Sequence, residues 1–315
     1  MDWYKHTAKK GWPDTSAEIQ AREGNNICKN FRNGHKETKC LHAFRTMNKS
    51  IILVDYSKDF YYIDTGPFRG GKKGHGSGNK HHRIVKNGFH ITNHKTSKEI
   101  YNLVGKEYPN TQFERYFHCK FKQWSPPKQR KGKNILICDD NHISILRCFG
   151  RARCAPRAWS ENIATQIKKI YPDANIKFRK KPTPSERRSN EWELNAQIIR
   201  EDIGVVVTLS SFVGLHALML GVPAIMLGPS EADYLSSKSL LDVKNPKYPT
   251  PEEFKDHMMW LACNQWSHDE LRNGTAWKYL KLLQGENVWN PNTCLSTFYP
   301  FSKSVSWKYK KINEL

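Results

Sequence analysis

The sequence predicts an α/β fold with a parallel sheet, in a chain long enough for two domains. Between residues 134 and 227, short apolar runs alternate with segments of helical spacing, which is typical of strands joined by crossover helices. These apolar runs are continuous, as expected for strands that are buried on both faces of a sheet. The composition changes at residues 124–133, where two prolines, a glycine and several basic residues indicate a linker between the domains.

The second half divides into strands and helices in strict alternation. We expect strands at 134–138, 175–179, 204–209 and 224–227, and helices at 156–170, 191–200 and 212–220. The first of these helices carries Trp159, Ile163 and Ile167 at helical spacing, and Gly221 closes the last one. Right-handed crossovers between such strands give a Rossmann-like domain, in which ligands bind beyond the carboxyl ends of the strands. Residues 251–283 are helical and rich in Trp, and they could pack back on the first domain.

The first half is polar, rich in His and less regular. Strands are expected at 50–55 and 60–64, followed by a turn at Gly66. Residues 69–83 combine five glycines with many basic side chains. This segment therefore cannot bury apolar surface and is predicted to be a mobile loop. The chain then returns to a strand or turn at 83–88.

Net charge restricts the partners. The chain of 315 residues has 51 Lys and Arg against 30 Asp and Glu, and 51 − 30 gives +21. Such an excess attracts polyanions, so nucleic acid, anionic membrane surfaces and acidic glycans are all eligible. No apolar run is long enough to span a bilayer and no signal peptide is visible, so we expect a cytoplasmic protein without membrane contact. The eight scattered cysteines are expected to be free thiols, and Cys28, His35, Cys40 and His42 match no regular zinc spacing.

The strongest chemical signal is a strand that ends at Ser210 and Ser211, directly before a small-residue helix. The first helical N–H groups lack internal partners, and with the helix dipole they attract an anion, which the two hydroxyls would also contact. Gly214 would let a ligand or a strand approach the first turn. The same residues also suit a purely structural role, with Ser210 as the helix cap.

This segment resembles the donor-binding motif of GT-B glycosyltransferases, Ser-Ser/Thr-x-x-Gly-x-(Glu/His)-Ala-x-x-x-Gly-x-Pro, and is also similar to bacterial capsule-type glycosyltransferases and the UDP-N-acetylglucosamine 2-epimerase group. The resemblance implies two Rossmann-like domains facing across a cleft, with helices at the C-terminus returning to the first domain. The expected divisions are 1–130 for the acceptor, 131–265 for the nucleotide sugar and 266–315 for the returning helices. It also implies that Ser210, Ser211 and Gly214 hold the diphosphate. His216 replaces the Glu that holds ribose hydroxyls in many relatives.

Two basic segments follow predicted strands. Arg151, Arg153 and Arg157 follow the strand at 134–138, up to the start of the next helix. Their guanidinium groups could bind diphosphate oxygens in a bidentate manner. Arg179 and Lys181 resemble the Arg-x-Lys-Pro turn of capsule-type enzymes, which lies near the nucleotide. Solvated basic loops, or a basic turn against a polyanion, would explain both segments as well.

Asp64 is the candidate general base, because it ends an apolar strand beside a glycine turn. An Asx turn onto Gly66 is the structural alternative. The run 62–68 followed by 80–88 resembles a pattern in phage-encoded glycosyltransferases, whose acceptor is often a hydroxymethylated pyrimidine in DNA, and Arg83 and Asn87 would correspond to residues of that pattern. The candidate contacts to double-stranded DNA are Lys72, Lys73, Lys80, His82, Arg83 and Asn87.

We therefore expect a monomeric glycosyltransferase that moves a sugar from a UDP-sugar to a hydroxymethylated pyrimidine in phage DNA, with no metal ligands indicated although a divalent ion could assist. The same fold acting on a surface polysaccharide or a lipid-linked sugar is the first alternative. A non-catalytic nucleic-acid-binding protein on this scaffold is the second. A 2-epimerase is disfavoured, because few carboxylates accompany the donor motif.

Overall fold

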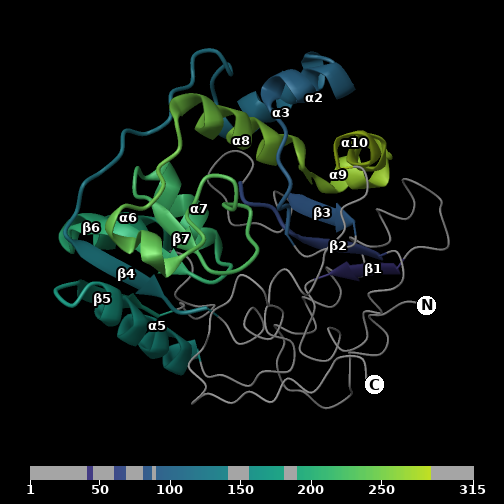
Figure 1. Cartoon of the computed structure of the whole chain (residues 1–315). Helices are drawn as coiled ribbons and strands as arrows, with labels where there is room; N and C mark the ends of the chain where they lie inside the picture. Colours follow the sequence, from purple (N-terminus) through teal and green to yellow (C-terminus); the bar gives the residue numbers. More distant parts are fainter. Residues whose placement is uncertain are drawn as a thin grey trace. The chain divides into compact units, whose positions relative to one another are not determined.

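The computed structural model describes residues 41–44, 60–68, 81–86, 90–140, 156–180 and 190–284 (Figure 1). The described residues fall into two compact units. Those within Met1–Pro127 and Pro249–Trp289 form the first unit, and those within Lys128–Tyr248 form the second. The chain therefore leaves the first unit, builds the second as one continuous stretch, and then returns to the first.

The second unit contains a four-stranded parallel sheet covered by helices, which confirms the predicted α/β character. Its strands are β4 (Asn134–Cys138), β5 (Asn175–Arg179), β6 (Ile203–Thr208) and β7 (Ala224–Met226), in the order β5-β4-β6-β7. The connecting helices are α5 (Pro156–Ile170), α6 (Asn190–Arg200) and α7 (Phe212–Met219), and a short 3-10 helix, η4 (Leu240–Lys244), follows β7. Each of the four strands and the three α-helices coincides with a segment predicted from periodicity, to within one or two residues, whereas η4 was not predicted.

Two apolar cores account for the layering of this unit. On one face, Trp159, Ile163 and Ile167 of α5 pack against alternate residues of β4, β6 and β7, together with η4. On the other face, Leu194 and Ile198 of α6 and Ala217 of α7 pack against the remaining residues of β4 and β6. Strands that are covered on both sides are continuously apolar, because both sets of alternating side chains leave water.

The first unit contains a mixed sheet in place of the expected second Rossmann-like sheet. Its strands are β1 (Leu41–Phe44), β2 (Phe60–Thr65), β3 (His82–Lys86) and β8 (Gln265–Trp266), in that spatial order. β1 and β2 are parallel, whereas β2 with β3 and β3 with β8 are antiparallel. The predicted strand at 50–55 lies outside the described residues.

The helices of the first unit come from two distant parts of the chain. α2 (Ser97–Val104) and α3 (Glu107–Phe117) precede the linker, while α8 (Pro251–Cys263), α9 (His268–Arg272) and α10 (Thr275–Gln284) follow the second unit. Capping boxes begin α2, α8 and α9 at Thr96, Thr250 and Ser267. The returning segment packs with the first unit from Pro249 onward, whereas the sequence placed this return at residue 266.

Burial explains why α8 belongs to the first unit. Nine of its residues are buried, including Phe254 and Trp260, and the Trp260 indole donates a hydrogen bond to the Asn93 carbonyl at 2.7 Å. Farther along, Trp266, Leu271 and Leu280 form one core with residues of β2 and β3. The Trp-rich stretch thus completes the core of the first unit and is more than a closing tail.

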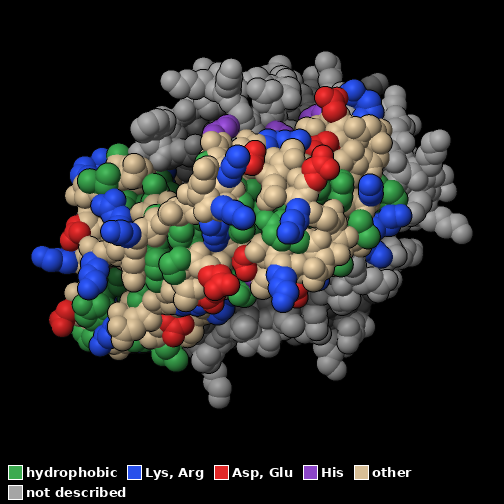
Figure 2. All heavy atoms as spheres, turned by 90° about the horizontal axis from the view of Figure 1, so that it is seen from above, with side chains coloured by type: hydrophobic (Ala, Val, Ile, Leu, Met, Phe, Trp, Pro, Cys, Tyr) green, Lys and Arg blue, Asp and Glu red, His purple; other side chains and the backbone are tan. Residues whose placement is uncertain are grey.

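The charged side chains are spread over the described surface in Figure 2. Lys and Arg lie at many separate places on this face, with Asp and Glu between them. Lys and Arg therefore do not gather into one basic patch on the described part of the face drawn. Among the described helices, none is long and apolar enough to cross a bilayer.

Candidate functional site

The carboxyl edge of the parallel sheet in the second unit is the place where a ligand site is expected. The chain leaves β4 toward α5 on one face and leaves β6 toward α7 on the opposite face. β4 and β6 are neighbours in the sheet, so the strand order reverses between them, and a crevice for a ligand is expected between the two strand ends. Of the residues singled out in the sequence, Ser210 and Ser211 follow β6 at this point.

Two aspartates, Asp139 and Asp140, directly follow β4. Their hydrogen bonds connect the end of β4 with the ends of β5 and β6. The Asp140 carboxylate is only 2% exposed and accepts a hydrogen bond from the Ser210 backbone N–H at 2.8 Å, across the crevice. The Asp139 N–H donates to the Arg179 carbonyl at 2.8 Å and extends the ladder between β4 and β5. The Asp139 carboxylate in turn accepts a 2.5 Å bond from the Ser160 hydroxyl of α5. Two carboxylates thus lie where β4, β5 and β6 end.

The start of α7 is capped by Ser211. Its side-chain oxygen accepts a hydrogen bond from the Val213 N–H at 3.3 Å, while Ser210 is buried. The structural role that the sequence allowed for Ser210 thus belongs to its neighbour. Ser211, Phe212 and Val213 are all half-exposed, so the first turn of the helix is open to one side. A helix start of this kind carries partial positive charge.

Gly214 brings α7 close to the sheet. A Cβ atom at this position would collide with the Met226 sulfur of β7 and would touch the Thr208 side chain at 3.4 Å. Of the two explanations that the sequence offered, the close approach is therefore that of a strand. His216 lies half-buried in the last turn of the same helix.

Among the basic donor candidates, Arg157 and Arg179 are the two that the structure describes. Arg179 ends β5, and one guanidinium nitrogen donates to the Gln197 side-chain oxygen of α6 at 2.8 Å. Arg151, Arg153 and Lys181 lie outside the described residues. Arg157, at the start of α5, stacks on the Phe178 ring with 3.9 Å between its guanidinium carbon and the ring centre, and it also pairs with Glu161 at 3.1 Å.

Asp64 lies in β2 of the first unit, held by three neighbours. Its carboxylate accepts hydrogen bonds from the Tyr62 hydroxyl and the Thr65 N–H, both at 2.7 Å. Arg83 sits opposite on β3, with a guanidinium nitrogen 3.6 Å from the same oxygen that Tyr62 contacts. The Asx-turn alternative is not what holds Asp64, because the Gly66 N–H donates to the His81 carbonyl at 2.8 Å. The Asp64 side chain is 20% exposed, so one side of it reaches solvent.

The two described DNA-contact candidates are buried. Arg83 is 2% exposed beside Asp64, and His82 is fully buried on the opposite face of the sheet. There the His82 Nε2 atom lies 3.2 Å from the Nε2 atom of His268 in α9. In this structure neither side chain is exposed for contact with a phosphate at the protein surface. Lys72, Lys73, Lys80 and Asn87 lie outside the described residues.

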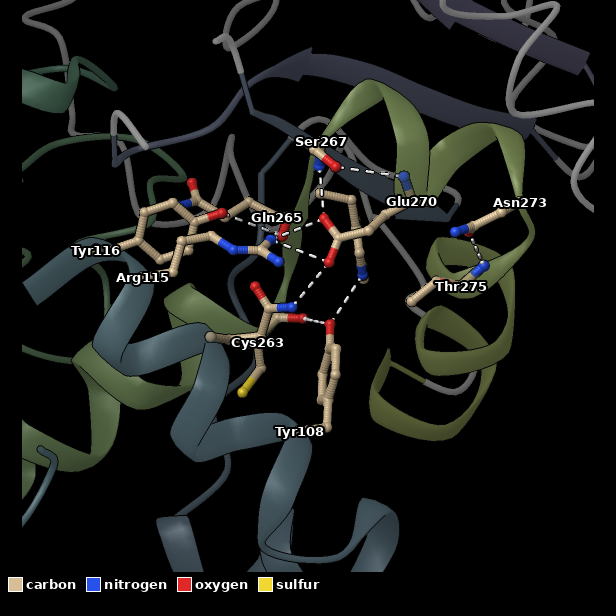
Figure 3. Close-up of polar contacts among 11 residues, drawn as sticks. Tyr108, Arg115, Tyr116, Cys263, Gln265, Ser267, Glu270, Asn273 and Thr275 are labelled. Carbon is tan, nitrogen blue, oxygen red and sulfur yellow. Dashed lines mark hydrogen bonds and ion pairs between the residues drawn. The ribbon is translucent and has the colours of Figure 1, made fainter. Parts of the chain in front are cut away.

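A partly buried polar network connects α3 with β8 and α9, and it was not predicted from the sequence (Figure 3). The Arg115 guanidinium contacts both carboxylate oxygens of Glu270, at 3.0 and 2.8 Å, and the Gln112 amide donates to one of them at 3.0 Å. The Ser267 N–H supplies a further bond at 2.8 Å. The Ser-x-x-Glu capping pattern at 267–270 was visible in the sequence, but its partners on α3 were not.

His81 lies beside this network, and its surroundings shift its pKa. Its ring meets Tyr116 edge-on, with the ring centres 5.2 Å apart. Burial, together with the positive charge of Arg115, lowers the pKa of His81 from 6.5 to about 4. The side chain is therefore neutral at physiological pH. Within the described residues, no group of three or more His, Cys, Asp or Glu side chains is arranged to hold a metal ion.

Comparisons with known proteins leave the family open. The chain matches no family model and no curated protein. Among solved structures it is similar to KpsC, beta Kdo 2,4 transferase, from Thermosulfurimonas dismutans, at 13% identity and a TM-score of 0.37 over 70% of this chain and 78% of that one. It is also similar to KpsC, beta Kdo 2,7 transferase, from the same organism, at 12% identity and a TM-score of 0.40 over 87% and 94% of the two chains. Scores this low do not establish a shared fold or activity.

Proposed function

We propose that this protein is a glycosyltransferase of the GT-B type, which moves a sugar from a nucleotide diphosphate donor, UDP in the first instance, to a hydroxyl group. The supporting observation is that the segment resembling the donor-binding motif spans the end of a strand, a helix and the start of the next strand at the carboxyl edge of a parallel sheet. The motif begins where β6 ends, its second serine caps α7, and its last glycine, Gly221, turns the chain toward β7 with a φ of 85°. Only glycine adopts that backbone conformation without strain.

In this proposal the diphosphate binds at the open first turn of α7. The Ser211 hydroxyl and the helix dipole stabilise the negative charge that develops on the leaving group. Asp140 restricts the position of the diphosphate, because its carboxylate would repel phosphate oxygens beside Ser210. We therefore assign the hydrogen bond to the diphosphate mainly to Ser211, and not to Ser210 and Ser211 equally. Arg151, Arg153 and Lys181 remain proposed donor contacts on the sequence pattern alone, and His216 a proposed ribose contact.

Asp64 is the proposed general base. One carboxylate oxygen would take the proton of the acceptor hydroxyl while the acceptor oxygen bonds to the sugar carbon and the bond from that carbon to the diphosphate breaks. The electron pair of the broken bond leaves with the nucleotide diphosphate. Tyr62 and Arg83 support this role by fixing the orientation of the carboxylate. Such a direct displacement inverts the sugar carbon, and the scheme requires no metal ion.

The acceptor is proposed from charge. A net charge of +21 favours a polyanion, and a hydroxymethylated pyrimidine in duplex DNA is the first acceptor to test. One observation favours the alternative of a surface polysaccharide or a lipid-linked sugar, because two of the six proposed DNA contacts, His82 and Arg83, are buried.

The test is incubation with a panel of UDP-sugars and three acceptors, namely plain DNA, hydroxymethylated DNA and an oligosaccharide. Mass analysis of nucleosides and glycans identifies the product. Transfer to hydroxymethylated DNA is expected, transfer to the glycan would select the alternative acceptor, and an absence of transfer with every donor would refute the glycosyltransferase proposal. Asp64→Asn should abolish transfer and leave UDP binding unchanged.

Ser211→Ala tests the donor site, with Ser239→Ala as its control. Both serines cap a helix of the second unit, since the Ser239 hydroxyl accepts from the Leu241 N–H at 3.1 Å at the start of η4. Each variant should lose about 1 kcal/mol of stability from its missing cap. Only Ser211→Ala should also reduce the rise in melting temperature that UDP causes. An equal response to UDP in both variants would remove Ser211 from the donor site.

A further inference from the structure

A run of four cationic side chains lies in the segment that leads into β4, at the amino edge of the parallel sheet (Figure 1). All four are exposed, and they belong to the last part of the linker that the sequence predicted. No Asp or Glu occurs in the sequence from residue 115 to residue 138, so no carboxylate lies close to them along the chain. We name this run the basic strip; it consists of Lys128, Arg130, Lys131 and Lys133.

Backbone hydrogen bonds hold the basic strip against the second unit. The Arg130 N–H donates to the Gly221 carbonyl at 2.7 Å, and the Lys133 N–H donates to the Asp202 carbonyl at 3.0 Å. Gly221 precedes β7 and Asp202 precedes β6, so the strip lies beside the starts of both strands before it enters β4. Its backbone is therefore fixed, while its side chains remain exposed.

Three glycines permit this close contact. A Cβ atom on Gly132 would collide with the backbone of residues 202–204, and one on Gly204 would collide with the Gly132 carbonyl. A Cβ atom on Gly221 would collide with the Lys128 carbonyl. Any other residue at these positions would push the strip away from the sheet edge, because only glycine allows two backbones to approach so closely.

The described part of the chain does not neutralise the basic strip. None of its four side chains takes part in an ion pair between described residues. Among the residues that contact its backbone, Asp202 alone is charged, so four cations against one carboxylate leave 4 − 1 = 3 positive charges. The fixed backbone also lowers the entropy that binding would cost, because only the side chains have to become ordered.

We propose that the basic strip binds the phosphate backbone of a double-stranded nucleic acid. Residues 128–133 span at most about 18 Å, and a duplex carries about ten phosphates over this length, enough for each cation to contact one. An acidic polysaccharide carries at most about one carboxylate per sugar ring, so it would release fewer counterions and bind the strip more weakly. Lysine and arginine contacts to phosphates do not read the base sequence, so the binding is independent of sequence.

This surface is separate from the candidate donor site. The basic strip precedes the first residue of β4, whereas Asp139 and Asp140 follow its last residue, and a strand of five residues is about 13 Å long. A duplex on the strip would therefore leave the first turn of α7 open to a donor. The inference goes beyond the proposed function, because it does not require sugar transfer.

The test is fluorescence anisotropy of a labelled duplex of unmodified DNA, titrated with the full chain at several salt concentrations. The strip variant replaces all four cations at once. It should reduce the slope of log K against log salt by about 3.6, so the unaltered chain should lose about 150-fold more affinity than the variant between about 50 and about 200 mM salt. The four substitutions are Lys128→Gln, Arg130→Gln, Lys131→Gln and Lys133→Gln.

A control variant removes the same net charge from exposed lysines outside the strip. It should keep the salt slope of the unaltered chain. The rise in melting temperature that UDP causes should be the same in both variants, because neither alters the start of α7. The control substitutions are Lys98→Gln, Lys106→Gln, Lys168→Gln and Lys169→Gln.

The outcomes separate this surface from the proposed enzyme activity. A smaller salt slope in the strip variant but not in the control supports the inference, even if no UDP-sugar proves to be a donor. Equal losses in the two variants would show that net charge alone attracts DNA and would overturn it, as would an absence of DNA binding by the unaltered chain. Polygalacturonate that binds more tightly than DNA, with the same dependence on the strip, would assign the surface to an acidic glycan and also overturn it.

Discussion

Acidification should remove a stabilising contribution of His81 as the pH falls below about 6.5. The unfolded chain takes up a proton on this side chain near pH 6.5, whereas the folded chain does so only near pH 4. Between these two values the unfolded state binds more protons, so the free energy of unfolding falls as the pH is lowered. Each pH unit in this interval is worth about 1.4 kcal/mol.

The magnitude follows from these two pKa values. At about pH 5 the difference amounts to about 2 kcal/mol relative to neutral pH, and the full effect below pH 4 is about 3 kcal/mol. Glu270 adds a loss of the same sign at lower pH. Burial alone would raise its pKa, but hydrogen bonds from Arg115 and from the Ser267 N–H outweigh burial and lower it. Its stabilising contribution is therefore present at pH 5 and is lost only as the pH falls further.

The assay is urea unfolding at about pH 7 and about pH 5 for the unaltered chain and for His81→Phe. Phenylalanine keeps a ring against Tyr116 and removes both the titrating group and a buried Nδ1 atom that has no hydrogen-bond partner within the described part of the chain. We expect the unaltered chain to lose about 2 kcal/mol more than His81→Phe over this interval. His118→Asn removes an exposed histidine at a left-handed position that Asn tolerates, and serves as the control. Parallel losses in the unaltered chain and in His81→Phe would refute the reasoning.

Three further predictions concern packing and the buried ion pair. Gly214→Ala should destabilise the second unit by about 1–3 kcal/mol, because its methyl group collides with Met226, and a melting temperature equal to that of the unaltered chain would contradict this packing. Gly221→Ala should cost about 1 kcal/mol, since alanine is strained at a φ of 85°; thermal unfolding measures the loss, and a neutral result would show that the turn adopts another conformation. Arg115→Met should lower the free energy of unfolding in urea by about 2 kcal/mol, because it leaves the largely buried Glu270 without its cation. This loss should become smaller once acid protonates the Glu270 carboxylate. A loss that does not depend on pH would indicate an effect of packing rather than of charge.

The elements of the second unit could be predicted from the sequence because their signals are local. Strand β6 contains a continuous run of β-branched residues from Val205 to Thr208, and Trp159, Ile163 and Ile167 mark the buried face of α5. The residues that begin α7 were visible for the same reason, since a serine pair directly after a strand is a short-range pattern. Even there, which of the two serines caps the helix depended on the backbone of Ser211 and on the Asp140 carboxylate that takes the Ser210 N–H.

The surroundings of the candidate base, Asp64, could not be predicted from local signals in the sequence. Asp64 could be chosen from its position at the end of an apolar strand, but its partner Arg83 could not be deduced, because the two meet only through the antiparallel register of β2 and β3. That same register turns His82 to the other face of the sheet, toward His268. A shift of one residue in the pairing of β2 with β3 would turn each side chain to the opposite face of the sheet. The described residues of these two strands carry apolar side chains on both faces, so the sequence pattern does not select one register.

By itself the sequence determined the α/β character of the second unit, the positions of its strands and helices, and the polar residues that follow each strand. These features depend on residues that are close together in the sequence. The tertiary structure alone decided the strand order that places β4 beside β6, the return of α8, α9 and α10 to the first unit, and the contact of Arg115 with Glu270. Those features join residues that are from about 70 to about 200 positions apart. Their formation is governed by how the whole chain buries its apolar surface, which no local pattern records.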